Sequence, residues 1–526
     1  MENYQNPVIS GYNPDPSICR VGEDFYLVNS SFEFFPGVPI YHSRNLVNWT
    51  LEGYCLHEER QDVLKQCRPS GGIYAPTIRF HQGTYFMTTT NTTHGGNFIV
   101  HTTDMKKGWS EPHWVDQGGI DPSLLFDEDG KVYFTSTGQG ENGKQGIVMC
   151  EVDPFTGERL SESVYISQGS GGRYPEGPHL YKIDGKYYLM IAEGGTEFGH
   201  METIRRADSP YGPYEECPHN PILSHRDDTR NEIYCTGHAD MVEDQNGNWW
   251  LVCLAVRPTG SAENRLMQHH LGRETFLAPV QWTEDGWPVV GENGTIALQM
   301  EGELPGPKPT QRNRDFRDDF SGGTLRGENE KDAFRLHYNY LRNPDETNYR
   351  LDTEKKQLIL KGTHVTLNEQ DSPTWIGIRQ KEFAIRASAK VHLLEAVEGR
   401  RAGITAFYND SYHYEIYLTK TGGKTEICLA KHVHDIFAVT ARAEIPQGKE
   451  NEVTLYIGAD QETYYFSYAL QDKTERFLGD GLAVGLCTEG TRTMTFTGTY
   501  IGMFAELGTA SFQAFEVKVL DERGED

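Results

Sequence analysis

Five copies of one sequence pattern constrain the fold of this 526-residue chain more than any other feature. Each copy begins with a small or acidic residue, often before proline, and an aliphatic residue usually follows three positions later. A turn containing Gly or Asp and an aromatic-rich run complete it. The copies are DPSICRVGEDFYLVNSS from Asp15, APTIRFHQGTYFMTTT from Ala75, DPSLLFDEDGKVYFTST from Asp121, GPHLYKIDGKYYLMIAEG from Gly177 and GHADMVEDQNGNWWLVCLA from Gly237.

The spacing of the copies matches one known repeat architecture. They start 46 to 60 residues apart, which is about the length of a four-stranded propeller blade. The turns DEDGK, KIDGK and DQNGN contain Asp-Gly or Asn-Gly, which are strong hairpin signals. The sequence therefore predicts an all-β fold with a five-bladed β-propeller over residues 1–300. A two-sheet sandwich of many strands is the alternative, and five matched copies argue against it.

Acidic residues recur at the starts of the copies. Equivalent positions of different blades face one central axis, so Asp15 and Asp121 should meet around a small pit. Glu176 stands directly before the fourth copy and His238 lies at the start of the fifth. A single Asp-Pro is more often a turn or strand-entry residue than a catalytic group. Three carboxyl groups in one pit repel one another, so their clustering indicates a functional site.

The motifs NPDPSICR, GGIYAPTIRF, GIDPSLLF, YPEGPHLY, GHADMV and LGRETF resemble those of glycoside hydrolase family 43. They occur in the family's order along nearly the whole chain. The similarity is greatest to its two-domain β-xylosidases and α-L-arabinofuranosidases, which join a five-bladed propeller to a β-sandwich and cleave with inversion. The resemblance implies that Asp15 is the general base and Glu176 the general acid. It makes Asp121 the third acid, which orients Glu176 and raises its pKa.

The same resemblance implies roles for five further residues. Arg273, in LGRETF, should bind substrate near the acids, and Phe32 and Tyr74 should wall the pocket. Tyr74 replaces the usual tryptophan, which leaves the sugar preference open. His238 should lie on the central axis, near the substrate or near a bound calcium ion or water. Phe496, in TFTGTYIGMF, should reach the sugar from the second domain; the alternative is that it belongs only to the core of that domain.

The second half of the chain lacks the repeat. The segment EGELPGPKPTQRNR is rich in proline and charge and predicts a linker over residues 301–314. Runs such as RASAKVHL, AGITAFYND and YHYEIYLT alternate apolar and polar residues, so residues 315–526 are predicted to form a β-sandwich of jelly-roll, concanavalin-like type. The resemblance implies that this domain packs on the propeller and that one of its loops closes the pocket.

Charge and cysteine content narrow the partners and the compartment. Acids outnumber bases 76 to 49 and the net charge is -27, which disfavours nucleic acid and anionic membranes as partners. The sequence contains no run of about 18 apolar residues, so no membrane span is predicted. The start MENYQNPVIS lacks the pattern of a secretory signal. Nine scattered cysteines without a C-x-x-C pair predict reduced, buried thiols in a cytoplasmic protein.

The sequence thus predicts an exo-acting, inverting glycosidase that acts on xylo- or arabino-oligosaccharides. β-1,4-Xylosidase is the first candidate, and α-L-arabinofuranosidase, alone or combined with it, is the alternative. A non-catalytic sugar-binding protein is disfavoured because all three acids are present, and an endo-arabinanase because it needs an open groove. No cofactor is expected to be required; a structural calcium near His238 and a homo-oligomer are compatible with the resemblance.

Overall fold

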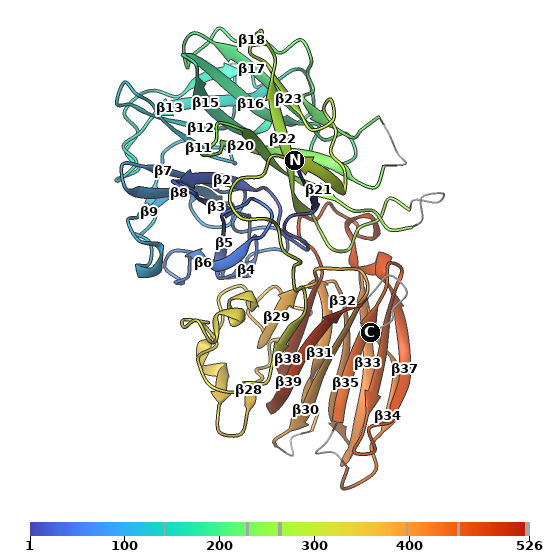
Figure 1. Ribbon diagram of the computed structural model, residues 1–526. Coiled ribbons are helices and arrows are strands. Elements are labelled where there is room, and N and C mark those ends of the chain that lie inside the picture. The colour runs from blue at the N-terminus through green and yellow to red at the C-terminus, as the bar shows by residue number, and fades with distance from the viewer. Residues whose placement is uncertain (141, 228–230, 261–265, 396–397, 450–452, 521–526) are drawn as a thin grey trace.

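The computed structural model describes residues 1–140, 142–227, 231–260, 266–395, 398–449 and 453–520. Its strands form two lobes (Figure 1). Within the described residues, the N-terminal lobe contains five antiparallel sheets of four strands each, and the fourth sheet also carries the short strand β19. The strands of the first three sheets are β2 (Ser17–Val21), β3 (Asp24–Val28), β5 (Gly37–Ser43), β6 (Thr50–Leu56), β7 (Thr77–His81), β8 (Thr84–Asn91), β9 (Gly96–Thr102), β10 (His113–Trp114), β11 (Ser123–Phe126), β12 (Val132–Gln139), β13 (Gln145–Glu151) and β14 (Val164–Ser167).

The last two sheets complete a closed ring. Their strands are β15 (Glu176–Ile183), β16 (Lys186–Glu193), β17 (Met201–Ala207), β18 (Glu215–Glu216), β19 (Leu223–Ser224), β20 (Tyr234–Glu243), β21 (Trp249–Val256), β22 (Glu274–Trp282) and β23 (Pro288–Val290). The first strand of each sheet lies innermost, and β2 contacts both β7 of the second sheet and β20 of the fifth. The predicted five-bladed propeller is therefore confirmed, with one blade for each sequence copy.

The C-terminal lobe is a sandwich of two large antiparallel sheets. The order of one is β27-β28-β39-β30-β35-β36-β37, with β25 beside β39; the order of the other is β34-β33-β32-β31-β38-β29-β26-β4. Their strands are β25 (Phe316–Asp318), β26 (Asn339–Leu341), β27 (Tyr349–Asp352), β28 (Gln357–Lys361), β29 (Trp375–Arg379), β30 (Ile385–Leu393), β31 (Arg401–Asn409), β32 (Tyr412–Thr421), β33 (Lys424–Val433), β34 (Ile436–Glu444), β35 (Val453–Ala459), β36 (Thr463–Ala469), β37 (Glu475–Leu482), β38 (Tyr500–Glu506) and β39 (Thr509–Val519).

One strand of this sandwich comes from the propeller. β4 (Phe34–Phe35) follows the first two strands of blade 1, and it pairs with β26, with Phe35 opposite Tyr340 and Phe34 opposite Leu341. Outside the two lobes' main sheets, β1 (Glu2–Gln5) pairs with β24 (Gln299–Gly302). The chain therefore joins its lobes by backbone hydrogen bonds as well as by the linker.

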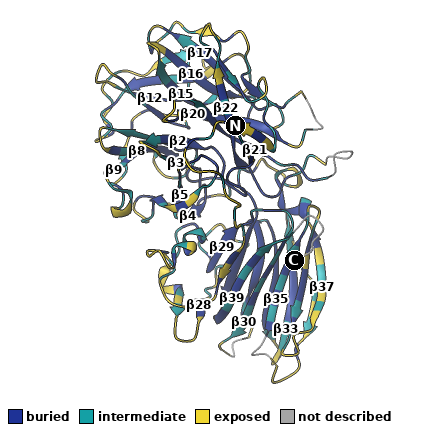
Figure 2. Ribbon diagram, in the orientation of Figure 1, coloured by how far each residue is buried: buried dark blue, intermediate teal, exposed yellow. Residues whose placement is uncertain are grey.

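Burial along the sandwich strands shows which face meets the propeller (Figure 2). β30 alternates buried and half-buried residues, as a strand with one core face should. β31 and β32 are instead buried almost throughout, because an aromatic cluster covers their second face. This cluster includes Phe34 of the propeller with Trp375, Phe407 and Tyr500 of the sandwich.

Helical structure in the described residues is limited to short 3-10 turns. These are η1 (Met105–Lys107), η2 (Ala333–His337), η3 (Glu346–Asn348), η4 (Ala483–Leu486) and η5 (Thr488–Gly490). None of the helices described here has the length and apolar character needed to cross a membrane.

A buried ion pair holds the inner strands of the propeller together. Asp240 of β20 accepts hydrogen bonds from Nη1 of Arg79 on β7 at 2.8 Å, from Oγ of Ser17 on β2 at 2.7 Å and from Oη of Tyr181 on β15 at 2.6 Å. The Asp240 side chain is fully buried. Burial opposes its ionisation, but Arg79 and these hydrogen bonds hold the pKa of Asp240 well below its usual value. Four of the five blades thus meet on one carboxylate.

We expect Asp240→Ala to lower the free energy of unfolding by about 3 kcal/mol, because it leaves the Arg79 guanidinium, which is only 16% exposed, without its carboxylate partner. Chemical denaturation of the purified protein measures this loss. The control is Lys131→Ala, which breaks an exposed ion pair with Glu151 (2.7 Å) and should cost less than about 1 kcal/mol. Equal, small losses in both variants would show that Asp240 does not hold the blades together.

Candidate active site

The aspartates of the two Asp-Pro-Ser copies share an unusual backbone conformation. φ is 51° at Asp15 and 57° at Asp121, in the left-handed region that side chains other than glycine rarely adopt. Gly177 (56°) and His238 (48°) have the same conformation in blades 4 and 5. Residues in such conformations cluster at functional sites. They also set the register of the repeat: the fifth copy begins at His238, one residue later than the predicted start at Gly237.

Two donors fix the side chain of Asp15. The Oγ of Ser30 donates to its Oδ2 at 2.5 Å, and Nη1 of Arg273 donates to its Oδ1 at 2.8 Å. The Asp15 side chain is 5% exposed and the Arg273 side chain 7% exposed. This buried pairing places Arg273 beside an acid, as predicted, and holds one carboxylate in a single orientation.

Arg273 also ties this acid to the sandwich lobe. It lies directly before β22, and its Nη2 donates to the backbone carbonyl of Phe496 at 3.1 Å. Its Nη1 lies 3.3 Å from the hydroxyl of Thr196, which accepts a weaker hydrogen bond. The Arg273 guanidinium carbon lies 5.7 Å from the ring centre of Phe32 and 5.4 Å from that of Phe496, so the cation sits against two aromatic rings.

Glu176 and Asp121 are neighbours across blades 4 and 3. The backbone N–H of Gly177, the residue after Glu176, donates to Oδ2 of Asp121 at 3.1 Å. Asp121 is 6% exposed, whereas Glu176 is half-buried at the start of β15. The structure therefore brings all three predicted acids together, each from a different blade.

The surroundings of Glu176 and Asp121 shift the pKa values of these two acids. Burial, reinforced by the negative charges of Asp121 and Asp15, raises the pKa of Glu176 well above its usual value. Burial and Asp15 raise the pKa of Asp121 to about 6, against the opposing effects of His238 and Arg273. Glu176 is therefore the group that keeps its proton at neutral pH, because its neighbours repel a second negative charge.

We expect Asp121→Asn to move the alkaline limb of the kcat/KM profile to lower pH by about one unit. The reason is that an acid catalyst works while protonated, and removing the Asp121 charge lowers the pKa of Glu176. Asparagine can still accept the Gly177 N–H, so the geometry is retained. A pH series with an aryl glycoside measures the limb, and Asp129→Asn, in an exposed turn of the same blade, is the matched control. An unchanged alkaline limb would mean that Asp121 does not tune the acid.

His238 lies between the acids, and its surroundings bear on the predicted calcium. Its Nδ1 is 3.9 Å from Oδ1 of Asp15, and its ring packs against Gly177, where an added Cβ would come within 3.2 Å. Calcium takes six to eight oxygen ligands, but no group of three or more His, Cys, Asp or Glu side chains converges as ligands among the described residues. A calcium near His238 therefore stays a prediction.

The predicted aromatic residues form one wall of the site. Phe32 stacks on Phe496 with ring centres 5.7 Å apart, and Tyr74 lies 5.2 Å from Phe32 and 6.0 Å from Phe496. The backbone N–H of Phe496 donates to Oγ of Ser70, in the propeller, at 2.9 Å. Phe496 therefore leaves the sandwich core and reaches the propeller, although it is only partly buried there.

Sequence patterns did not point to several residues that shape the site. Ser30 holds Asp15, Thr196 contacts Arg273, and Glu202 accepts the backbone N–H of Ala239, next to His238, at 3.1 Å. Glu202 is buried, and this burial raises its pKa well above the usual value. Thr196 and Glu202 lie outside the five copies, and Ser30, one of two adjacent serines at the end of the first copy, is not distinguished from its neighbour by the pattern.

Comparisons with known proteins agree with this geometry. The model of the family described as Glycosyl hydrolases family 43 matches residues 4–288, and that of a Beta xylosidase C-terminal Concanavalin A-like domain matches residues 326–518. The non-reducing end alpha-L-arabinofuranosidase BoGH43B of Bacteroides ovatus is 39% identical over 99% of this chain and 96% of its own length. A xylosidase/arabinosidase of Butyrivibrio fibrisolvens is 39% identical over 80% of this chain and 81% of its own length.

Solved structures lead to the same family. A xylan beta-1,4-xylosidase from Bacillus halodurans superposes with a TM-score of 0.89 at 29% identity, and the match covers 98% of this chain and 100% of that one. Both lobes are thus shared, in the same order. The two family models, the relatives and the three carboxyl groups around Arg273 together show that this chain belongs to glycoside hydrolase family 43.

Proposed function

We propose that this chain is an exo-acting, inverting glycoside hydrolase that releases a terminal pentose from short oligosaccharides, with β-D-xylose as the first candidate. The observation that carries the proposal is the group of Asp15, Asp121 and Glu176, held on three blades beside Arg273. Hydrolysis with inversion needs one protonated and one ionised carboxyl group on opposite sides of the sugar. The electrostatic separation of the acids supports this division of labour.

Each acid then has a distinct task. Glu176 donates its proton to the departing glycosidic oxygen, and Asp15 takes a proton from the water that attacks the opposite face of the sugar. Asp121 accepts the Gly177 N–H, which orients the acid, and its charge keeps Glu176 protonated. Arg273 balances the negative charge of the pit and can donate to sugar hydroxyls. No step requires a metal ion or a cofactor.

The aromatic wall supports exo action. Phe496 reaches the propeller from the sandwich lobe and stacks on Phe32, beside Tyr74. A long polysaccharide would need a groove that is open at both ends, whereas aromatic rings packed against Arg273, beside Asp15, would close one side of the site. The substrate would therefore enter with its non-reducing end, and one sugar unit would be released in each turnover.

α-L-Arabinofuranose is the second candidate for the released sugar. One observation favours it: a non-reducing end alpha-L-arabinofuranosidase of Bacteroides ovatus is 39% identical over 99% of this chain. The test is kcat/KM for matched aryl β-D-xyloside and aryl α-L-arabinofuranoside. A ratio well above one assigns the chain as a xylosidase, and a ratio well below one as an arabinofuranosidase. No activity on either would refute the proposal.

The stereochemistry of hydrolysis gives a sharper test of the mechanism. We expect the first sugar released to have the opposite anomeric configuration to the substrate, because water attacks directly and no covalent sugar forms on Asp15. Proton NMR during the first turnovers distinguishes the two anomers before they equilibrate. A product that retains the configuration would exclude Asp15 as the general base.

The cysteines support a reducing compartment. All nine lie among the described residues, and all are free and buried, which is usual in cytoplasmic proteins. We infer that the natural substrates are short oligosaccharides taken up by the cell. Fractionation of the native host, with the enzyme located by an antibody, tests the compartment.

A further inference from the structure

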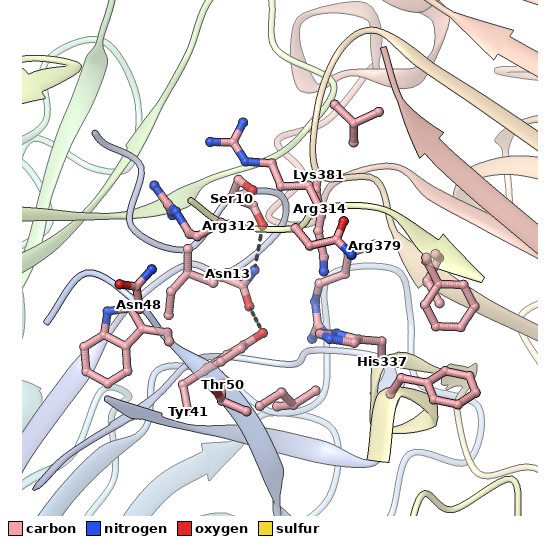
Figure 3. A pocket seen from close by; sticks show the side chains of 18 of the residues that line it. Ser10, Asn13, Tyr41, Asn48, Thr50, Arg312, Arg314, His337, Arg379 and Lys381 are labelled. Atoms are coloured by element: carbon pink, nitrogen blue, oxygen red, sulfur yellow. Dashed lines mark hydrogen bonds between the residues drawn. The ribbon is translucent and has the colours of Figure 1, made fainter. Parts of the chain in front are cut away.

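A pocket lined with cations lies at the seam between the lobes, and neither the three acids nor Arg273 is among its lining residues (Figure 3). It encloses about 400 Å³ between the linker, the start of the propeller and the sandwich. Arg312, Arg314, Arg379 and Lys381 line it, and no Asp or Glu among the described residues does. The chain carries a net charge of -27, so a local excess of positive charge is opposite to its overall character.

Arg379 is a buried cation of the pocket whose charge is not balanced by an acidic side chain of the lining. It ends β29 and is only 5% exposed, yet its Nε and Nη2 have no hydrogen-bond partner within the described chain. Its guanidinium carbon lies 5.3 Å from the ring centre of Tyr12 and 5.7 Å from that of Tyr500. Aromatic faces attract a cation but do not replace its hydrogen bonds. A buried guanidinium is costly, and negative charge in the adjoining pocket would stabilise it even though Nε and Nη2 are covered by the protein.

The two linker arginines differ in how their charge is balanced. Arg312 donates only to backbone carbonyls, those of Gln5 and Pro7 at 2.8 Å and that of Val8. Arg314 pairs with Glu382, but this acid is outside the pocket and already binds Arg257 at 2.8 Å.

Lys381 lies close to two of these arginines. Burial, with Arg379 and Arg314 nearby, lowers its pKa to about 8. Burial, with Lys381 and Arg379 nearby, also lowers the pKa of His337, on a third side of the pocket, well below its usual value. A dianion placed among these groups would relieve the repulsion between them.

The rest of the lining suits a polar organic group attached to the anion. Facing the cations, Oδ1 of Asn13 accepts from Oη of Tyr41 at 2.7 Å, and its Nδ2 donates to the carbonyl of Ser10 at 3.2 Å. Figure 3 shows Asn13 between Ser10 and Tyr41, with Thr50 beside Tyr41. The cations come from two separate segments, the linker (Arg312, Arg314) and the end of β29 (Arg379, Lys381), so they can approach a tetrahedral phosphate from two sides, whereas a planar carboxylate engages one guanidinium fork.

We propose that this seam pocket binds a small phosphate dianion, of the sugar phosphate class, and that the bound anion fastens the sandwich lobe to the propeller. The cations of the linker and of the sandwich would then share one ligand with the propeller's Asn13. This site is independent of the glycosidase site, so it does not rest on the assignment of the catalytic acids.

The test is isothermal titration of the full-length protein with inorganic phosphate, ribose 5-phosphate and ribose, at constant ionic strength. We expect saturable binding of one ribose 5-phosphate per chain, with a rise in melting temperature, and no binding of ribose. Stronger binding of ribose 5-phosphate than of inorganic phosphate identifies a phosphate monoester as the ligand, and equal binding identifies free phosphate. No saturable binding of either phosphate at millimolar concentrations overturns the proposal.

Variants locate the binding site. Arg379→Gln and Lys381→Gln should each weaken ribose 5-phosphate binding at least about tenfold, because each removes a charged donor. Arg317→Gln is the matched control, since it removes an exposed charge from β25, beside the pocket, and should leave affinity unchanged. Lys381→Gln carries the test if Arg379→Gln does not fold. Equal weakening in the control would indicate nonspecific attraction and overturn the proposal.

Activity separates this site from the glycosidase site. Phosphate bound at the seam should not compete with an aryl glycoside for the enzyme. Competitive inhibition that persists in Lys381→Gln would place the anion beside Arg273 instead and would overturn the proposal.

Discussion

Asp15→Ala is expected to reduce kcat/KM by about 10⁴-fold on every substrate, at the upper end of what the loss of a general base costs. The base acts on water, so its absence matters equally for good and poor leaving groups. The structure adds a second cost, because Arg273 loses the carboxylate that its Nη1 contacts at 2.8 Å. The measurement is kcat/KM on xylobiose and on aryl glycosides whose phenols span a range of acidity.

Two further variants separate chemistry from folding. Asp15→Asn keeps the size and a hydrogen-bond acceptor for Arg273, and it should be nearly as inactive as Asp15→Ala. Ser30→Ala removes only the hydroxyl that donates to Asp15 at 2.5 Å, and it should retain most of the activity. Melting temperatures of the three variants report whether the fold survives. If an activated aryl glycoside restored Asp15→Ala to near the native rate, Asp15 would have to be the acid and not the base.

The second large effect should come from Glu176→Ala, and it should depend on the substrate. When xylobiose is hydrolysed, the departing xylose is a poor leaving group that needs a proton from the acid, so kcat/KM for xylobiose should fall by about 10³-fold. When the substrate is an aryl glycoside of an acidic phenol, the phenolate departs unaided, so kcat/KM for this substrate should fall less than about tenfold. The ratio of aryl glycoside to xylobiose activity, measured against the same ratio for the native enzyme, is the decisive quantity.

The pH profile of this variant provides an independent check. The raised pKa of Glu176 sets the alkaline limb, so in Glu176→Ala that limb should disappear for the activated aryl substrate. Glu176→Gln, which keeps the shape but has no proton to donate, should behave as the alanine variant does. An alkaline limb that remains in both variants would assign the proton to another group.

The propeller could be predicted because its information is local and repeated. Each copy carries its own turn and its own aromatic strand, so five weak signals support one another. The two Asp-Pro-Ser copies located Asp15 and Asp121, the place directly before the fourth copy located Glu176, and the resemblance then gave each acid its role. The fifth copy was misplaced by one residue because Gly237 resembles the small residue that opens other copies, whereas the left-handed backbone belongs to His238.

Features that depend on contacts between distant segments could not be predicted. The alternation of apolar and polar residues does not reveal that β31 and β32 are buried on both faces, since that burial depends on the propeller packed against them. Asp240 and Arg79 read as ordinary charged residues of surface strands until closure of the ring brings four blades onto them. The seam pocket likewise collects cations from two segments that are far apart in the sequence.

The pairing of β4, from blade 1, with a strand of the sandwich limits how far the two lobes of this enzyme can move apart. β4 begins two residues after Phe32, in the aromatic wall, and its ladder with β26 crosses the boundary between the lobes. A hinge motion that separated the lobes would break these backbone hydrogen bonds and displace the aromatic wall. Substrate entry by such a motion is therefore not expected. Loading and unloading must instead rely on side chains and loops at the rim. Deletion of the C-terminal lobe from this chain would therefore leave β4, which is part of the first blade's own sequence, without its partner strand β26.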